Sequence, residues 1–365
     1  MTRSRELAEL ATAYDTGTPL GMRNRLINSD MRIDQRNAGA SITPLDAQYS
    51  VDRWGCYRSQ ASKYSVQQNA GAVTPPAGFT NYLGATSLSA YSSVSSDYFG
   101  IAQSVEGLNF ADLAFGTANA RAVTLSFWVR SSLTGTHGGS LRNSANNRTY
   151  CFSYSVAAAN TWEFKTITVP GDTTGTWLAT NGVGINVWFD LGSGSTATGA
   201  AGSWNASNVI RPTGSVSVVG TSGATWQVTG VQLEAGSVAT PFERRPYGTE
   251  LALCQRYAVV YGGSTFERLG GTSSYSFIQS TCITFLPVPM RTTPSISATG
   301  NWQDELPGIA SQLITVFSLD TNGSSPRLIK FDVTHASNAS YGSSKAGQVT
   351  AANDASARFF VTAEL

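Results

Sequence analysis

The stretch AVTLSFWV at residues 122–129 indicates the fold class of this chain. Its side chains alternate with a period of two, and one face collects the apolar residues Val123, Leu125, Phe127 and Val129. The other face carries Trp128, which makes it a candidate for a second buried layer. Alternation of this kind is typical of a β-strand that packs on a core.

Similar runs flank this stretch on both sides, at residues 99–106, 149–156, 162–169, 183–190 and 225–234. No helical pattern separates them, so the sequence predicts an antiparallel jelly-roll β-sandwich over residues 21–247. The Gly-, Ser- and Asn-rich segments 136–147 and 192–208 are predicted to be loops outside the sandwich.

A boundary follows at TPFERRPYG, residues 240–248, where Pro241 and Pro246 interrupt backbone hydrogen bonding. Residues 250–257 then show a short helical run, and further β patterns continue to the end of the chain. The sequence therefore predicts a short helix and a smaller C-terminal β domain over residues 248–365.

The first residues differ from the rest of this mainly all-β chain. SRELAELATAY, residues 4–14, places Leu7, Leu10, Ala11 and Tyr14 at helical spacing. Such a short amphipathic helix must pack on its own body or on another chain. We assign residues 1–20 as a helix and linker for oligomerisation or attachment. The charged start lacks the apolar stretch of a secretory signal, so we expect synthesis in the cytoplasm without a signal peptide.

Composition limits the partners. In 365 residues, 24 Lys and Arg balance 23 Asp and Glu, and only 13% of residues are charged. Broad electrostatic capture of nucleic acid is therefore not expected. No apolar run is long enough to predict membrane insertion. With 41% apolar residues and 36 glycines, the chain has material for a core and for many turns.

The sequence offers few candidate catalytic residues and motifs, and we predict a protein that is not an enzyme. The two histidines, His137 and His335, are predicted to lie on surface loops, and neither GxSxG nor SxxK occurs. The four cysteines are scattered, which predicts buried reduced thiols and neither a metal site nor a cofactor. Two acids in a cleft would suffice for glycoside hydrolysis. The candidate acids in the first domain are instead interpreted as turn caps, strand ends and cross-strand partners: Asp30, Asp34, Asp46, Asp52, Glu106 and Glu163.

Aromatic recognition remains as a candidate function. Trp177, Trp204 and Trp302 lie in segments of small residues, and an exposed ring beside amides and hydroxyls suits the C–H face of a sugar. We take these three as candidate carbohydrate contacts. Loop tryptophans also anchor loops to a core or fill subunit interfaces, and that alternative stays open.

Several stretches resemble a known group of proteins: residues 24–39 (NRLINSDMRIDQRNAG), 49–57 (YSVDRWGCY), 122–132 (AVTLSFWVRSS) and 226–257 (WQVTGVQLEAGSVATPFERRPYGTELALCQRY). They resemble phage tail fibre and minor virion structural proteins whose middle domain is similar to a carbohydrate-binding jelly-roll module. The resemblance covers nearly the whole chain. It implies that residues 24–33 and 228–234 open and close one sandwich.

The resemblance also implies structural rather than ligand-binding roles for its motif residues. Trp54 and Trp226 are expected in the core, and Pro241 and Pro246 at a rigid corner. Arg53 and Arg244 are expected as buried or interface partners of ion pairs.

Three functions follow as hypotheses. The first is a non-enzymatic virion protein, a tail fibre or receptor-binding appendage, that forms a homotrimer, contacts other virion proteins and binds host-surface polysaccharide through several weak sites. The second is a capsid decoration or head-fibre protein. The third, ranked last, is a polysaccharide depolymerase.

Overall fold

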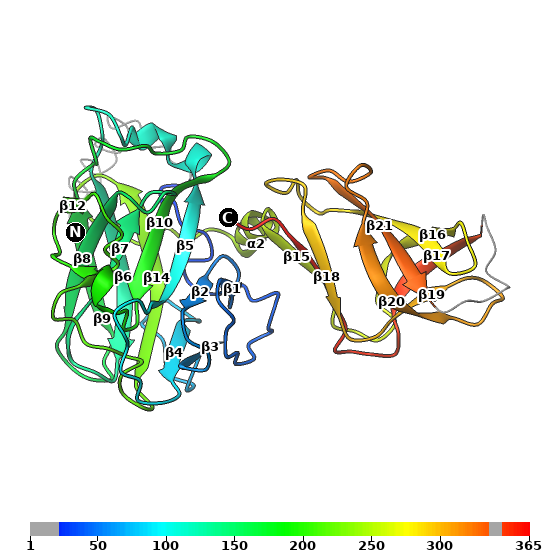
Figure 1. The fold of residues 1–365 in the computed structure, drawn as a ribbon, viewed down its shortest axis with the longest axis horizontal. Coiled ribbons are helices and arrows are strands. Elements are labelled where there is room, and N and C mark those ends of the chain that lie inside the picture. The colour runs from blue at the N-terminus through cyan, green and yellow to red at the C-terminus, as the bar shows by residue number, and fades with distance from the viewer. Residues whose placement is uncertain (1–21, 336–344) are drawn as a thin grey trace. The chain divides into compact units, whose positions relative to one another are not determined.

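The computed structural model describes residues 22–335 and 345–365 (Figure 1). These form two compact units. The first runs to Pro246 and takes in Leu365, and the second spans Tyr247–Glu364. The helix predicted at residues 4–14 lies outside the described residues.

The first unit is an antiparallel jelly-roll β-sandwich of two sheets. The seven-stranded sheet has the order β1 (Gln48–Tyr49), β2 (Gly55–Arg58), β5 (Phe99–Glu106), β10 (Val183–Asp190), β7 (Gly135–Arg142), β8 (Thr149–Val156) and β12 (Trp204–Asn205). The five-stranded sheet has the order β3 (Tyr64–Gln68), β4 (Leu83–Ser87), β14 (Thr225–Ala235), β6 (Val123–Ser131) and β9 (Glu163–Val169).

The core of this unit lies between the two sheets. The alternating residues of β6, from Val123 to Val129, are fully buried on the inner face. Phe189 of β10 packs across from them, with its ring centroid 5.1 Å from that of Phe127 and 5.3 Å from that of Trp226. Complete burial of such a side chain contributes about 1.5–3 kcal/mol. The period-two pattern therefore gives the sandwich its stability as well as its shape.

Short elements connect the strands. They are the 3-10 turns η1 (Gly107–Asn109), η2 (Ala111–Leu113) and η3 (Ser195–Ala197), and the parallel pair β11 (Thr198–Gly199) and β13 (Arg211–Pro212). Residues 24–33, expected as an opening strand, form no regular strand. They follow β14 through irregular bonds, with Arg25 N donating to Leu233 O and Val231 N to Ser29 O.

The structure contradicts the loop predicted at residues 136–147 over its first half. Residues up to Arg142 form β7, which pairs with both β10 and β8 inside the seven-stranded sheet. A Cβ on Gly139 would lie 1.9 Å from the carbonyl oxygen of Trp188. The glycines therefore permit close packing, where sequence composition suggested a turn. His137 accordingly lies in a strand and is 2% exposed, and burial lowers its pKa.

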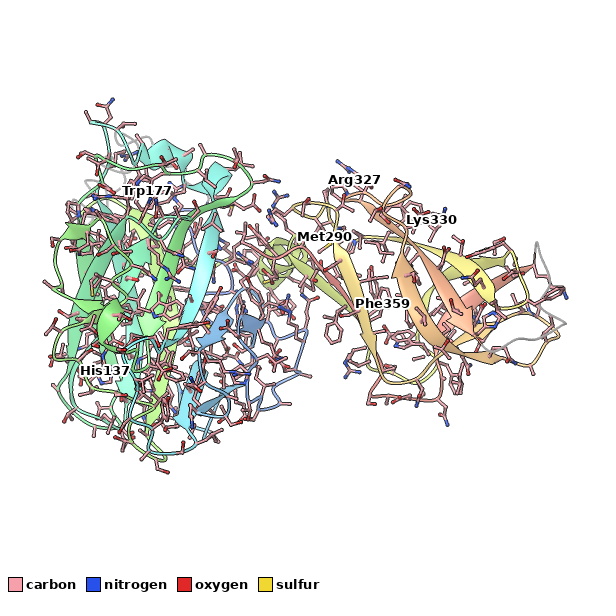
Figure 2. All side chains as sticks on the ribbon, viewed as in Figure 1. His137, Trp177, Met290, Arg327, Lys330 and Phe359 are labelled. Carbon is pink, nitrogen blue, oxygen red and sulfur yellow. The ribbon has the colours of Figure 1, made fainter. Side chains whose placement is uncertain are left out.

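The second unit begins with α2 (Tyr247–Gln255), followed by two groups of strands. A three-stranded sheet has the order β15 (Ala258–Gly262), β23 (Arg358–Thr362) and β18 (Ser295–Thr299). A closed barrel has the order β16 (Arg268–Ser274), β17 (Gln279–Phe285), β21 (Leu328–His335), β20 (Gln312–Leu319), β19 (Trp302–Glu305) and β22 (Ala346–Ala351). Phe359 of β23, labelled in Figure 2, packs in the core of the second unit, where its ring centroid lies 5.1 Å from that of Phe331.

The four cysteines are all free and buried, as predicted. Burial raises the pKa of Cys56, Cys151 and Cys282 to about 12, so these thiols stay protonated at neutral pH. In the described part of the chain, no helix has the length and apolarity needed to cross a bilayer.

Candidate functional site

Trp177 and Trp204, distant in sequence, meet in the folded chain. Their ring centroids are 5.4 Å apart in an edge-to-face arrangement. Phe115 contacts both, at 4.9 Å from Trp177 and 5.8 Å from Trp204. Figure 2 shows Trp177 among the loops at one end of the sandwich.

Both indoles use their polar groups internally. Trp177 Nε1 donates to Thr174 O at 3.2 Å, and Trp204 Nε1 donates to Pro170 O at 2.8 Å. Both rings are half-buried against the core. This geometry favours the alternative role of loop anchor, while a sugar contact by either ring stays a prediction.

The structure contradicts the exposed position predicted for Trp302. It is 1% exposed and packs within the second unit, 6.1 Å from the ring of Phe359. Its Nε1 donates to Thr299 O. Neither face of the ring is available to a sugar, so the predicted carbohydrate contact at Trp302 is wrong. The small residues around Trp302 suggested an exposed loop. The ring instead packs into the core, directly after a turn.

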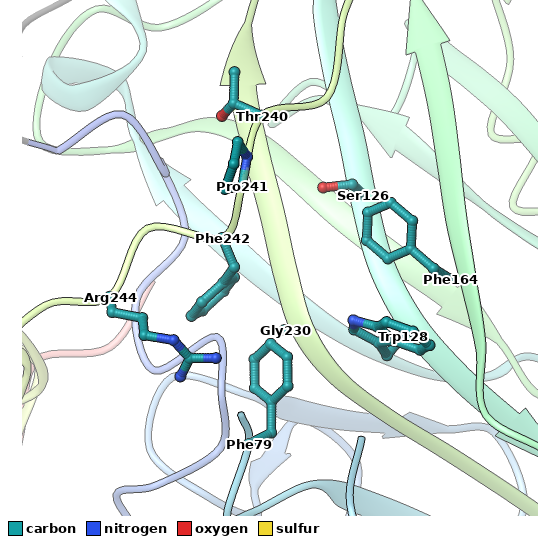
Figure 3. A pocket seen from close by; sticks show the side chains of 9 residues that line it. All are labelled: Phe79, Ser126, Trp128, Phe164, Gly230, Thr240, Pro241, Phe242 and Arg244. Carbon is teal, nitrogen blue, oxygen red and sulfur yellow. The ribbon is translucent and has the colours of Figure 1, made fainter. Parts of the chain in front are cut away.

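A different aromatic site lies on the outer face of the five-stranded sheet (Figure 3). We call it the aromatic hollow, and its volume is about 370 Å³. Figure 3 shows Phe79, Phe242 and Arg244 on one side and Trp128 and Phe164 on the other. Its lining consists of Phe79, Ser126, Trp128, Phe164, Gly230, Thr240, Pro241, Phe242 and Arg244.

Strand pairing builds one wall of the hollow. Trp128 of β6 lies directly opposite Phe164 of β9, and their ring centroids are 5.4 Å apart. Ser126 shares the face of Trp128 because it is two residues away on the same strand. Trp128 is half-buried and Phe164 is 48% exposed. Trp128 therefore joins no second core layer but keeps part of its ring open.

A turn and a bulge build the floor. Phe79 follows a turn closed by its own N–H on Pro76 O, with Gly78 at φ +85°. Its ring lies on Gly230, which sits in the bulge of β14 at φ +60°. A Cβ on Gly230 would come within 2.5 Å of Phe79 Cζ. Glycine is required here both by the backbone and by the ring above it.

An extended segment, residues 240–245, forms the opposite wall. Thr240 N and Oγ1 donate to Glu234, and Glu243 N donates to Gln232 Oε1. The Glu243 carboxylate accepts the backbone N–H groups of residues 22–24. Alternate side chains face opposite ways in an extended chain. With Glu243 held on the protein side, Phe242 and Arg244 therefore face the hollow.

This alternation corrects the buried position expected for Arg244, while an ion pair at an interface stays a prediction. Arg244 is exposed, with its guanidinium 4.6 Å from the centroid of Phe79 and 5.6 Å from that of Phe242. It forms no ion pair within the described residues. The buried cation is its neighbour Arg245, which pairs with Glu243 at 3.1 Å. Burial favours the neutral acid, but the backbone N–H of Asn24 and the charge of Arg245 outweigh it and lower the pKa of Glu243.

Three donors of the hollow are not used by the protein. Trp128 Nε1, Ser126 Oγ and the Arg244 guanidinium bond to no other side chain or backbone group in the described ranges. In Figure 3 the indole nitrogen of Trp128 faces Gly230, and the Ser126 hydroxyl points into the hollow. An apolar hollow with a few convergent polar groups is the usual form of a small-ligand site.

The other motif residues lie away from the hollow or beside it. Trp54 and Trp226, predicted as core, are fully buried, and Arg53 is buried with its Nη2 donating to Ser104 O at 2.6 Å. Pro241 lines the hollow, and Pro246 ends the first unit; both are exposed.

The buried acid–base pair of the second unit has no access to solvent. His335 Nε2 lies 3.7 Å from Asp304 Oδ2, and both side chains are fully buried. Asp304 also accepts the hydroxyls of Thr272 and Ser280. The surface position predicted for His335 is therefore wrong. Within the described ranges no three His, Cys, Asp or Glu residues converge as metal ligands.

Sequence reasoning missed the hollow, although Trp128 and Arg244 were each singled out. The missing signal was the pairing of residues 122–129 with residues 162–169, which brings Trp128 against Phe164. A second signal was the alternation of aromatic and charged residues in PFERR, residues 241–245.

No family model matches this chain, and no curated protein matches it at a significant level. Distant similarity to solved structures is found. One is TmCBM61 in complex with β-1,4-galactotriose, at 11% identity and a TM-score of 0.31, covering 59% of this chain and 99% of that one.

Two further solved structures show comparably low similarity. The enzymatically active domain of bacteriophage CBA120 tailspike protein 4 has 10% identity and a TM-score of 0.31, covering 59% of this chain and 22% of that one. The family 11 carbohydrate-binding module of Clostridium thermocellum Lic26A-Cel5E has 15% identity and a TM-score of 0.27, covering 56% and 100%. At such values the likeness does not say what this chain binds.

Proposed function

We propose that this protein is a non-enzymatic phage virion protein, a tail fibre or receptor-binding appendage, that binds host-surface glycan in the aromatic hollow. The observation that carries glycan binding is the combination of open ring surface at Trp128 and Phe164 with unused donors beside it. Aromatic rings pack on the C–H faces of sugars, and the donors satisfy hydroxyl oxygens.

Binding without catalysis fits the lining of the hollow. Among its described lining residues none carries a carboxylate or an imidazole. Acid–base cleavage of a glycosidic bond uses a pair of carboxyl groups at the sugar. The hollow offers donors and rings in their place, which suits retention of a ligand.

The virion location and the trimer rest on the sequence. The resemblance at residues 24–39 and 226–257 supports a virion protein, and the helical spacing at residues 4–14 supports self-association. Repeated weak sites on one trimer bind a surface far more tightly than a single site.

The test is adsorption of the purified full chain to host cells, followed by calorimetry with oligosaccharides prepared from the host surface. We expect Trp128→Ala and Phe164→Ala each to weaken binding about tenfold, equivalent to ~1.4 kcal/mol. Phe285→Ala is the matched control, since Phe285 is an aromatic residue 77% exposed on the second unit. Loss of binding in the control alone would place recognition in the second unit and contradict the proposal.

Two accompanying measurements test the remaining parts. Release of new reducing ends with sustained turnover would show a depolymerase. Gold-labelled antibody on intact virions should mark the tail or its fibres. Label spread over the head would instead indicate a decoration protein.

A further inference from the structure

Among the described residues, Arg244 lacks the carboxylate partner that several other arginines of the first unit have. Six of them have a carboxylate oxygen within 3.8 Å: Arg23, Arg25, Arg32, Arg148, Arg211 and Arg245. Arg244 has none within the described part of the chain. Its guanidinium lies over the rings of Phe79 and Phe242, at the edge of the hollow.

The two carboxylates that anchor residues 240–245 already have partners of their own. Glu243 pairs with Arg245 and accepts the N–H groups of residues 22–24. Glu234, behind Thr240, is 1% exposed, accepts the Thr240 hydroxyl, and lies 3.6 Å from Arg23. The positive charge of Arg244 is therefore left for a ligand.

The rings beneath Arg244 fix where that charge lies. Stacking on two aromatic rings holds the planar guanidinium and leaves its N–H edge free. Gly78 makes this position possible, because a Cβ there would lie 2.9 Å from Arg244 Nη2. A guanidinium held in this way matches the two oxygens of an anionic group.

From this geometry we propose that the hollow selects an acidic glycan, in which an anionic substituent of the sugar pairs with Arg244 while the sugar ring packs on Trp128 and Phe164. The inference rests on the proposed function and specifies its ligand class. Trp128 Nε1 and Ser126 Oγ donate to oxygens of the same sugar. A uronic acid carboxylate and a sulfate ester both supply the required anion.

The test is calorimetry of the full chain with three matched oligosaccharides. The first is an oligouronate, the second is its carboxyl-reduced neutral form, and the third is the neutral form carrying sulfate. We expect the neutral form to bind about tenfold or more weakly than an anionic form, as loss of a charged hydrogen bond predicts. Preference for the oligouronate over the sulfated form identifies the carboxylate, and the reverse identifies the sulfate.

Variants assign the effect to Arg244. Arg244→Gln should remove the preference for the anionic form, and Arg244→Lys should retain part of it because the charge remains without the planar fork. Arg327→Gln, at an exposed arginine of the second unit labelled in Figure 2, should change nothing. All variants are checked for unchanged thermal unfolding.

The outcomes separate the inference from the proposed function. Equal binding of the neutral and anionic forms, with loss in Trp128→Ala, would overturn acidic selection and leave glycan binding standing. Wild-type preference retained in Arg244→Gln would also overturn it. Absence of binding to all three sugars, or binding unaffected by Trp128→Ala, would overturn the proposed function and the inference together.

Discussion

The ring of Phe79 rests on the backbone of Gly230, so closely that a single added carbon would meet Phe79 Cζ at 2.5 Å. This contact joins the turn at residues 76–79 to the bulge of β14 and forms the floor of the aromatic hollow. The site therefore depends on a backbone feature as well as on its aromatic side chains.

Gly230→Ala should destabilise the first unit by about 1–3 kcal/mol, because the methyl group overpacks the floor and φ +60° disfavours alanine. Urea unfolding followed by tryptophan fluorescence measures the loss. Gly223→Ala is the control, since Gly223 has φ +73° and open space around its Cα. Equal losses in the two variants would show that the ring contact adds nothing to the backbone strain.

Glu243 should make the wall of the hollow sensitive to acid. Its pKa is lower in the folded chain than in the unfolded chain, so its stabilisation is present above the unfolded value and is lost as the pH falls through the folded value. Glu243→Gln should cost about 1–3 kcal/mol at neutral pH. The difference in unfolding free energy from wild type should shrink below pH ~4; a difference independent of pH would contradict this role.

Asp190 should show the opposite dependence. Burial raises its pKa to about 6, although Arg211 and the N–H groups of Gly192 and Ser193 act in the other direction. Its contribution to stability is present at low pH and is lost as the pH rises through about 6.

NMR titration of the side-chain carboxyl carbons tests this shift directly. Asp172 is the internal reference: burial opposes ionisation there, but the two-pronged bond from Arg148 outweighs it and lowers the pKa. We expect Asp190 to titrate well above Asp172. Titration of both near the ordinary value for aspartate would contradict the buried position of Asp190.

Trp177 and Trp204 should act as a unit that anchors loops. Alanine at either position should cost about 1–3 kcal/mol, and a double-mutant cycle should give a coupling of about 0.5–1.5 kcal/mol from their edge-to-face contact. Glycan binding should be unchanged in both single variants. Additive losses, or weakened binding with unchanged stability, would favour the sugar-contact role predicted from sequence.

The sequence predicted much of the fold because strands of the first unit alternate cleanly. The bounds predicted at residues 99–106, 149–156 and 183–190 agree with β5, β8 and β10. Strand β7 was missed because Gly138 and Gly139 are small where neighbouring strands approach closely, and composition alone reads such residues as a loop.

The hollow was harder to predict because its parts meet only through long-range pairing. Phe164 faces Trp128 through strand register, and Phe79 arrives from a separate turn. Alternation within residues 241–245 decides that Arg245 is buried and Arg244 exposed, yet the sequence alone does not say which of the two faces inward. Trp302 was wrongly predicted at the surface because its sequence neighbours are small, and the structure buries it.

The most direct test of glycan binding in the hollow is a ¹H–¹⁵N NMR titration of the eight tryptophan indole groups with host-surface oligosaccharide. The Trp128 Nε1–H, which has no partner among the described residues, should shift in a saturable way, and Trp128→Phe identifies its signal. Trp177 and Trp204, whose Nε1–H groups are held by backbone carbonyls, should stay in place. Saturable shifts of Trp177 and Trp204 with Trp128 unmoved would contradict the account and return recognition to the loop end of the sandwich.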